Sequence, residues 1–200
     1  MCEELEIRNA VLISRANLEA AFLVNRAFKS VKRYLLHKLE ADLRRQLLEN
    51  DYQIDINNGF FDGNTGCDFG ILFNGQQDVR LTLGFDSKNF GDFYFGMAGK
   101  DEHLNKSQEA RAEIDRVMTS IFGPSANISA ANASQWIWYY YPNGVEVQGF
   151  RFDEEFRNWS NHPEPWLAMH DGSLAQTILD VADKVRDAFI NRMGPLMPNN

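Results

Sequence analysis

Two aspartates and a lysine are the residues of this chain whose types and spacing best fit a chemical reaction. Asp68 begins one expected strand, and the segment from Asp86 to Lys88 ends the next, with 17 residues between the two aspartates. Because alternate residues of a strand point to the same side, Asp86 and Lys88 are expected to share a face. Two carboxylates can bind Mg²⁺, which prefers oxygen ligands. A neighbouring lysine can orient or deprotonate water, so these residues predict metal-dependent hydrolysis of a phosphodiester.

The segment before these residues, positions 1–50, is expected to be helical. It is long enough for two helices, with a break near Asn25. Apolar residues recur at steps of three and four, which predicts one buried stripe along the helix. Lysines and arginines occupy the remaining surface, where they either dock nucleic acid or, more commonly, face solvent. The expected stripe consists of Phe28, Val31, Leu35, Leu39, Leu43 and Leu47.

Residues 51–99 change to a period of two, which indicates β-strands. Strands are expected at 52–56, 68–73, 79–85 and 93–97, and Asn74-Gly75 is a typical hairpin turn between two of them. Leu81, Leu83 and Phe85 fall on one face of the third strand. Short connections of this kind predict an antiparallel β-meander that positions Asp68 and Asp86.

Residues 100–200 are expected to mix helices with an aromatic strand. A helix is predicted at 107–122, an aromatic strand at 136–141 with 145–152 as its partner, and a final helix at 173–192. The segment from Trp159 to Trp166 is either an exposed recognition loop or a packed lid. The whole chain is therefore predicted to be one α+β domain, with a long N-terminal helical segment, a central antiparallel β-meander and flanking helices.

An Asp, a hairpin and then Asp-x-Lys, preceded by a helix, resembles the core of the PD-(D/E)XK nuclease superfamily. That core is an α-β-β-β-α-β arrangement, so the resemblance implies a restriction-endonuclease-like fold or a partial version of it. It further implies that Asp68 and Asp86 are metal ligands and that Lys88 is catalytic. Glu40 or Glu49 would then supply the additional acidic residue that superfamily members often carry on the first helix. Cys67 occupies the position before the first Asp, where the motif has proline.

A second resemblance covers roughly residues 34–189. The segment RLTLGFDSKNFGDFYFGM, followed by a polar helix, a Trp-rich strand and a final helix, is similar to the C-terminal half of a prokaryotic and phage subfamily of these nucleases. In that subfamily this half follows the catalytic motifs. Asp86 and Lys88 would then match a hairpin loop instead of the metal site, and the protein would lack a catalytic centre.

The distribution of charge favours a protein partner over nucleic acid. Residues 1–50 hold 9 Lys/Arg against 7 Asp/Glu, whereas residues 51–200 hold 11 against 21, a net charge of −10. A protein that binds phosphates usually shows the opposite balance, so the acidic part suggests basic protein partners, a metal or merely solubility. The N-terminus lacks the basic and then apolar pattern of an export signal, and no apolar run is long enough to cross a bilayer. A cytoplasmic location without membrane contact is therefore expected.

Two functions of different classes stay open at this point. The first is a nuclease-related but non-catalytic binding module without a cofactor, of phage or bacterial defence or anti-defence origin. It would act through an acidic and aromatic surface on a protein partner or a nucleic-acid-processing complex. The alternative is a Mg²⁺-dependent PD-(D/E)XK-type nuclease that uses Asp68, Asp86 and Lys88. The two functions differ in whether the protein is an enzyme and in whether it binds nucleic acid directly, and the sequence leaves both questions open.

Overall fold

The chain begins with two helices that are separated by a capped turn. The computed structural model describes residues 2–49, 52–66, 68–73, 76–99, 108–122, 136–141, 145–147, 150–152 and 154–192. The helices are α1 (Cys2–Leu12) and α2 (Arg15–Glu49). The Ser14 hydroxyl accepts a hydrogen bond from the Asn17 amide at 3.1 Å, which is a typical N-cap. The expected break near Asn25 is therefore wrong, because α2 runs through it and the cap signal lies at Ser14.

A five-stranded antiparallel sheet in the order β1-β2-β3-β4-β5 forms the centre of the molecule. This topology confirms the predicted α+β class with a central antiparallel meander. The alternation predicted for the first strand is also observed, with Tyr52 buried and Asp55 exposed. The strands are β1 (Tyr52–Ile56), β2 (Asp68–Phe73), β3 (Gln76–Ser87), β4 (Gly91–Gly99) and β5 (Trp138–Tyr140).

The two faces of this sheet carry different residues. One face, called the helix face here, carries large apolar side chains such as Ile71, Leu81 and Phe95, all with no exposed surface. The opposite face, called the glycine face, has Gly70, Thr82 and Gly96 directly opposite one another on three neighbouring strands. Successive side chains of a strand point to opposite faces, so the chain neighbours of a residue on one face lie on the other face.

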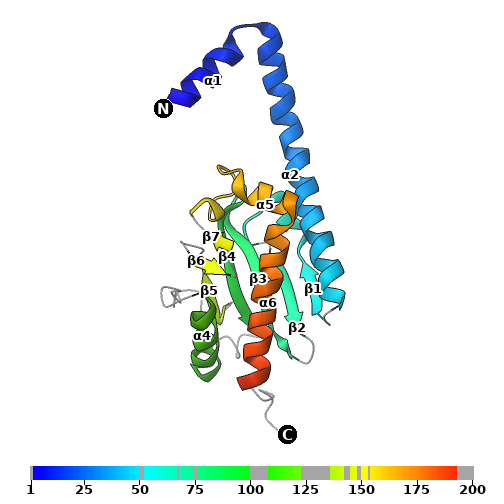
Figure 1. Cartoon of the computed structure of the whole chain (residues 1–200), viewed down its shortest axis with the longest axis vertical. Coiled ribbons are helices and arrows are strands. Elements are labelled where there is room, and N and C mark those ends of the chain that lie inside the picture. Colours follow the sequence, from blue (N-terminus) through cyan, green and yellow to red (C-terminus); the bar gives the residue numbers. More distant parts are fainter. Residues whose placement is uncertain are drawn as a thin grey trace.

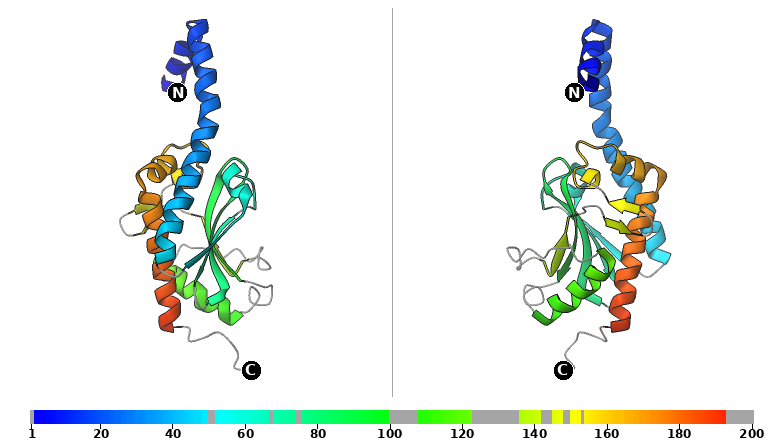
Figure 2. Two further views of the ribbon diagram at one scale, coloured as in Figure 1. Left: turned by 90° about the vertical axis from the view of Figure 1, so that its right-hand side faces the viewer. Right: turned by 60° about the vertical axis from the view of Figure 1, so that its left-hand side comes forward.

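Four helices bury the helix face of the sheet. Besides α2 they are α4 (Gln108–Phe122), α5 (Glu164–Asp171) and α6 (Ser173–Arg192). Figure 2 shows α2 and α6 beside one another on the same side of the sheet, and the two helices are in contact. The bounds predicted for the final helix, 173–192, are confirmed. The fully buried helix residues include Leu43, Leu47, Ile114, Val117, Leu174 and Val185.

The segment 145–152 does not pair with the aromatic strand as expected. Instead β5 pairs antiparallel with β4, placing Tyr140 opposite Phe95. The strands β6 (Val145–Val147) and β7 (Phe150–Phe152) form a separate two-stranded sheet with each other. The aromatic strand thus adds to the central sheet, where the ring of Trp138 is fully buried against that of Phe122.

The segment from Trp159 to Trp166 packs its two tryptophans into the core, whereas Ser160, Asn161, Pro163 and Glu164 between them are exposed. Trp159 is 1% exposed, and its ring contacts Phe93 and Phe85 at centroid distances of 4.6 and 4.9 Å. Trp166 lies on α5 and donates a hydrogen bond from its indole nitrogen to the Trp159 carbonyl at 2.8 Å. The structure therefore shows features of both interpretations that the sequence left open, with packed tryptophans at the ends and an exposed loop between them.

The N-terminal helices project from the body as an arm, defined as α1 together with residues 15–34 of α2 (Figure 1). Phe28 and Val31 are each 46% exposed, whereas Leu35 is only 6% exposed. The predicted buried stripe is therefore wrong for Phe28 and Val31, because the body that covers this side of α2 begins at Leu35. Among the helices that the structure describes, none combines the length and apolar character needed to span a membrane.

Candidate functional site

Asp68 and Asp86 lie on the same face of the sheet, on neighbouring strands. Asp68 is the first residue of β2 and is directly opposite Gly84 of β3. Asp86 follows two residues later on β3, so both carboxylates belong to the glycine face. Diagonal positions of this kind are about 7–8 Å apart in antiparallel sheets. The sequence left the relation between Asp68 and Asp86 open, and the register of β2 against β3 decides it.

An ion pair within the sheet engages the Asp68 carboxylate. Arg80 Nη2 donates to Asp68 Oδ2 at 3.0 Å, and Arg80 Nη1 donates to Asp55 Oδ2 at 3.2 Å. Burial raises the pKa of the Asp68 carboxyl, Arg80 opposes that rise, and the charge of Asp55 adds to it. Arg80 lies over Gly70, where a Cβ would be 3.1 Å from its Cδ. The missing side chain at Gly70 therefore makes room for this pair.

Replacing Arg80 by methionine is expected to raise the pKa of Asp68 further, because it removes the cation that opposes burial. A carboxyl whose folded-state pKa is raised stabilises the fold below its unfolded pKa and loses that contribution as the pH rises. The variant should therefore lose roughly 1–3 kcal/mol of unfolding free energy at neutral pH and less at acidic pH. Urea denaturation at both pH values, with carboxyl NMR titration of Asp68, measures these effects.

A matched control for that variant is Arg44→Met on α2. Arg44 also donates to one carboxylate, that of Glu40, with 2.9 Å between Nε and Oε1, but its side chain is 48% exposed. Exposed pairs contribute about 0.2–1 kcal/mol, so this control should change stability little. An unchanged or lowered Asp68 pKa in Arg80→Met would contradict the assigned role of the pair.

Asp86 is engaged by a different partner. The Tyr141 hydroxyl donates a hydrogen bond to Asp86 Oδ2, and Asp86 itself is exposed. Burial, followed by the charges of Asp68 and Asp86, raises the pKa of the Tyr94 hydroxyl. Tyr94 is 2% exposed and covers Gly84, where a Cβ would lie 2.5 Å from its hydroxyl oxygen. A buried tyrosine hydroxyl thus lies in the electrostatic field of both carboxylates.

Lys88 does not continue the strand as predicted. It is the first residue of the turn between β3 and β4, and its side chain is exposed. The next two residues, Asn89 and Phe90, both have positive φ values of 60° and 63°. This reversal ends the period of two, so the expectation that Asp86 and Lys88 share a strand face is wrong. The Phe90 ring anchors the turn by packing on Trp166, with centroids 5.2 Å apart.

The helical glutamates lie apart from the two aspartates. Glu40 is on α2, which covers the helix face, so the sheet lies between Glu40 and the carboxylates on the glycine face. Its own carboxylate pairs with Arg44 and, at 3.4 Å, with His37 Nδ1. Glu49 ends α2, and its side chain is outside the described residues, as is Cys67. Within the described part of the chain, no group of three or more His, Cys, Asp or Glu side chains is arranged to hold a metal ion.

Acidic and aromatic side chains gather at the edge of the glycine face. We call this surface the acidic–aromatic patch and define it by Asp86, Asp92, Trp136, Tyr139 and Tyr141. The patch contains a narrow crevice, bounded by Asp86, Tyr94, Trp136 and Tyr139, with about 170 Å³ of empty space but no room for the centre of a water molecule. A crevice this narrow cannot enclose a substrate, so any ligand would contact the surface of the patch.

An arginine of the chain itself already occupies one side of this patch. The guanidinium of Arg157 lies 4.9 Å from the centroid of the Tyr141 ring. Its Nε donates to Asp92 Oδ1 at 3.1 Å, and the Ser87 hydroxyl donates to Asp92 Oδ2 at 2.5 Å. The Ser87 hydrogen bond is the main cause that lowers the pKa of Asp92, with Arg157 contributing and burial opposing. The ionised form of the Asp92 carboxyl is therefore favoured on this side of the patch, close to the Tyr141 ring.

The sequence analysis did not identify Arg80, Tyr94 or Arg157 as neighbours of the candidate residues. One usable signal was present. If Leu81, Leu83 and Phe85 face the core, then Arg80 and Gly84 must lie with Asp86 on the opposite face. Nothing local in the sequence indicates Arg157, which comes from a segment 65 residues away from its partner Asp92.

Comparison of the chain with protein-family models, with curated proteins and with solved structures finds no match. The interpretation of the site therefore rests on its own residues and their geometry.

Proposed function

We propose that this protein is a non-catalytic macromolecular binding module whose acidic–aromatic patch binds a basic, arginine-bearing segment of a protein partner. The contact of Arg157 with Tyr141 and Asp92 is the observation that carries the proposal. An aromatic face beside a carboxylate is a common way to recognise a guanidinium group, which stacks and forms charge-assisted hydrogen bonds. Asp86, which accepts from the Tyr141 hydroxyl, and Tyr139, whose ring contacts that of Tyr141, offer a second carboxylate and a second ring.

The charge distribution supports a basic partner. Residues 51–200 carry a net charge of −10, and they include the whole patch. A field of one sign steers a partner of the opposite sign and raises its rate of association. A protein component of a nucleic-acid-processing complex fits this description, because proteins that bind phosphates expose arginines and lysines. No cofactor is part of this proposal.

The surroundings of the three predicted catalytic residues favour binding over hydrolysis. Asp68 is paired with Arg80, Asp86 accepts from Tyr141, and Lys88 lies in an exposed turn. A metal ion would have to displace a cation and a hydrogen-bond donor before both aspartates could bind it. The order of α2, the meander, α4 and β5 supports a nuclease-related ancestry, with a phage or bacterial defence or anti-defence origin as part of the same proposal.

Binding of a fluorescent hexa-arginine peptide tests the patch, with hexa-lysine as a probe of equal charge. The wild-type chain should bind the arginine peptide more tightly, because a lysine ammonium cannot stack or bond bidentately. Tyr139→Ala and Asp86→Asn should each weaken that binding by about tenfold, as expected for residues central to a contact. Fluorescence anisotropy at two salt concentrations measures the affinities.

Asp187→Asn is the matched control for the peptide experiment. Asp187 is an exposed carboxylate on α6, which lies on the helix face, so its loss should leave peptide affinity unchanged. Equal binding of both peptides, or an equal effect of Asp187→Asn and Asp86→Asn, would show only a general attraction to an acidic protein. That outcome would contradict the proposed patch.

The competing enzymatic function makes a different prediction. We expect no cleavage when the chain is incubated with single- or double-stranded DNA or RNA in the presence of Mg²⁺ or Mn²⁺. Cleavage that is lost in Asp86→Ala and in Asp68→Ala would contradict the non-catalytic proposal and would support a PD-(D/E)XK-type nuclease.

A further inference from the structure

The helical arm exposes apolar side chains on most of its circumference. Phe22, Leu23 and Val24 are consecutive and are 68%, 66% and 68% exposed. Successive residues of an α-helix are rotated by about 100°, so these three residues cover more than half of the helix surface. Within the described parts of the chain, no segment therefore covers most of the surface of α2 around residues 22–24.

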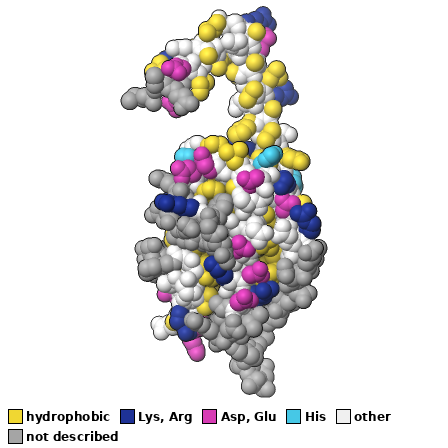
Figure 3. Space-filling view, in the orientation of Figure 1, with side chains coloured by type: hydrophobic (Ala, Val, Ile, Leu, Met, Phe, Trp, Pro, Cys, Tyr) yellow, Lys and Arg dark blue, Asp and Glu magenta, His cyan; other side chains and the backbone are white. Residues whose placement is uncertain are grey.

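The same character extends along both helices of the arm. On α1 and the following turn, Leu5, Ile7, Leu12 and Ile13 are exposed, and on α2 Phe28 and Tyr34 are exposed as well. Figure 3 shows apolar side chains along this projecting part of the molecule. A helix that is apolar all round is normally buried, as in the centre of a helix bundle. The arm thus presents a surface that needs a partner of similar shape.

The two helices of the arm carry opposite charges. α1 has three glutamates and one arginine, whereas residues 26–33 of α2 contain four basic residues and no acidic one. Of these four, Lys32 lies over the Trp166 ring of α5, and Arg26, Lys29 and Arg33 are exposed. α1 is about 16 Å long, so an α1 folded back along its own α2 ends before it can cover this basic stretch. The acidic helix of one chain can therefore complement the basic stretch of another.

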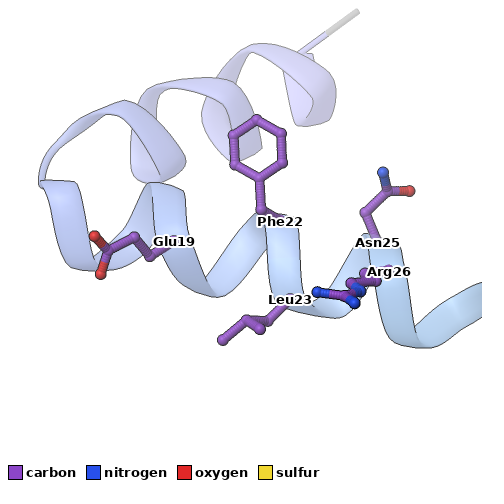
Figure 4. A pocket seen from close by; sticks show the side chains of 5 residues that line it. All are labelled: Glu19, Phe22, Leu23, Asn25 and Arg26. Atoms are coloured by element: carbon purple, nitrogen blue, oxygen red, sulfur yellow. The ribbon is translucent and has the colours of Figure 1, made fainter.

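We propose that the arm is a self-association interface, in which two copies pair about a twofold axis and α1 of each copy lies against residues 26–33 of the other. A hollow of about 730 Å³ on the arm is lined by Glu19, Phe22, Leu23, Asn25 and Arg26 (Figure 4). It would receive apolar side chains of the second α1. The same patch is used twice in such an interface, which closes the assembly at a dimer. The acidic–aromatic patch is a separate surface, so this inference is independent of the proposed function.

Sedimentation equilibrium of the full chain over a concentration series tests the interface. The wild-type chain should approach twice its mass of 22.9 kDa. Phe22→Glu should weaken dimerisation by more than about tenfold, because it places a charge at the centre of the apolar surface. Leu167→Glu is the matched control, since Leu167 is 60% exposed on α5 and outside the arm. Circular dichroism should show an intact fold in both variants, because both positions are exposed.

A charge-reversal experiment identifies the occupant as a second copy. One variant combines Glu4→Lys with Glu6→Lys, and the other combines Lys29→Glu with Arg33→Glu. Each variant alone should be monomeric, because like charges then meet at both symmetry-related contacts. An equal mixture of the two should dimerise again, because every contact then joins opposite charges.

Three results would overturn the proposal. One is a wild-type chain that stays monomeric at all concentrations, including one that sediments with phosphatidylcholine–phosphatidylglycerol vesicles and so favours a lipid surface. Another is a dimer that Phe22→Glu leaves unchanged. The third is a pair of charge-reversed variants that do not recover association when mixed.

Discussion

Replacing Trp159 by alanine is expected to lower the free energy of unfolding by about 3–5 kcal/mol, the range for removal of a buried large aromatic side chain. Trp159 is 1% exposed and contacts the rings of Phe85, Phe93 and Trp166. Its backbone amide also donates to the Phe90 carbonyl at 3.1 Å, which ties this segment to the β3–β4 turn. The variant therefore opens a cavity where the Trp159 ring packs on the helix face of the sheet.

Two controls separate the causes of that destabilisation. Trp159→Phe keeps most of the ring volume but loses the indole hydrogen bond to the Phe156 carbonyl, which is 2.7 Å long, so its effect should be smaller. Leu167→Ala removes an exposed side chain from the same region and should stay within about 0.5 kcal/mol of the wild type. Urea unfolding followed by tryptophan fluorescence and circular dichroism measures all three. An effect of Trp159→Ala no larger than that of Leu167→Ala would contradict the burial of Trp159 in the core.

Replacing Gly63 by alanine is expected to be the most damaging glycine substitution among those considered. Gly63 has a φ of 62° and caps a short 3-10 helix, Asn58–Asp62. A Cβ there would lie 2.8 Å from the Phe90 backbone nitrogen and from its ring. The left-handed conformation costs a residue with a Cβ about 1–2 kcal/mol, and the overlap adds roughly 1–3 kcal/mol more.

Gly66 offers a matched control for that substitution. Its φ of 71° is similar, but a Cβ at Gly66 would have no neighbouring atom within 4 Å. Gly66→Ala should therefore show only the backbone cost of about 1–2 kcal/mol. The difference in unfolding free energy between the two variants isolates the contact with Phe90. Equal destabilisation of Gly63→Ala and Gly66→Ala would mean that this contact contributes nothing.

Gly63→Ala and Trp159→Ala both affect the β3–β4 turn, which lies next to the acidic–aromatic patch. The Asn89 amide donates to the Gly63 carbonyl at 2.9 Å, and the turn leads directly into Asp92. The Gly63 and Trp159 variants should therefore weaken binding of the arginine peptide only in proportion to loss of folded protein. Tyr139→Ala, by comparison, should weaken binding without changing stability to the same degree.

Local patterns were sufficient to predict most of the central elements. The alternation of Leu81, Leu83 and Phe85 predicted β3 and its buried face, because alternate side chains of any strand must share a side. The final helix was predicted at 173–192 and is observed at those bounds, since its apolar period of three to four residues is local information. The same alternation in β3 places Asp86 on the face opposite those three residues, but only the register of β2 against β3 brings Asp68 to that face.

The predictions that were wrong concern burial and contacts between distant segments. Phe28 and Val31 continue the apolar period of α2, yet they are exposed because the body of the protein ends near Leu35. Periodicity identifies which side of a helix is apolar, but only the packed neighbours decide whether that side is covered. Lys88 does not lie on the predicted strand face because the chain turns after Ser87. The buried Phe90 holds this turn with a positive φ, a conformation that a phenylalanine rarely adopts.

Asp68 and Asp86 show the same difference between what local sequence and what tertiary contacts decide. By itself the sequence determined their residue types and indicated the strands that carry them, whereas the strand register placed them on a common face. Only the tertiary structure decided their partners, because the strand register brings Arg80 to Asp68 and the addition of β5 to the sheet brings Tyr141 to Asp86. A carboxylate in a sheet binds whichever donor the neighbouring strands place beside it, and that choice depends on residues as many as 55 positions away.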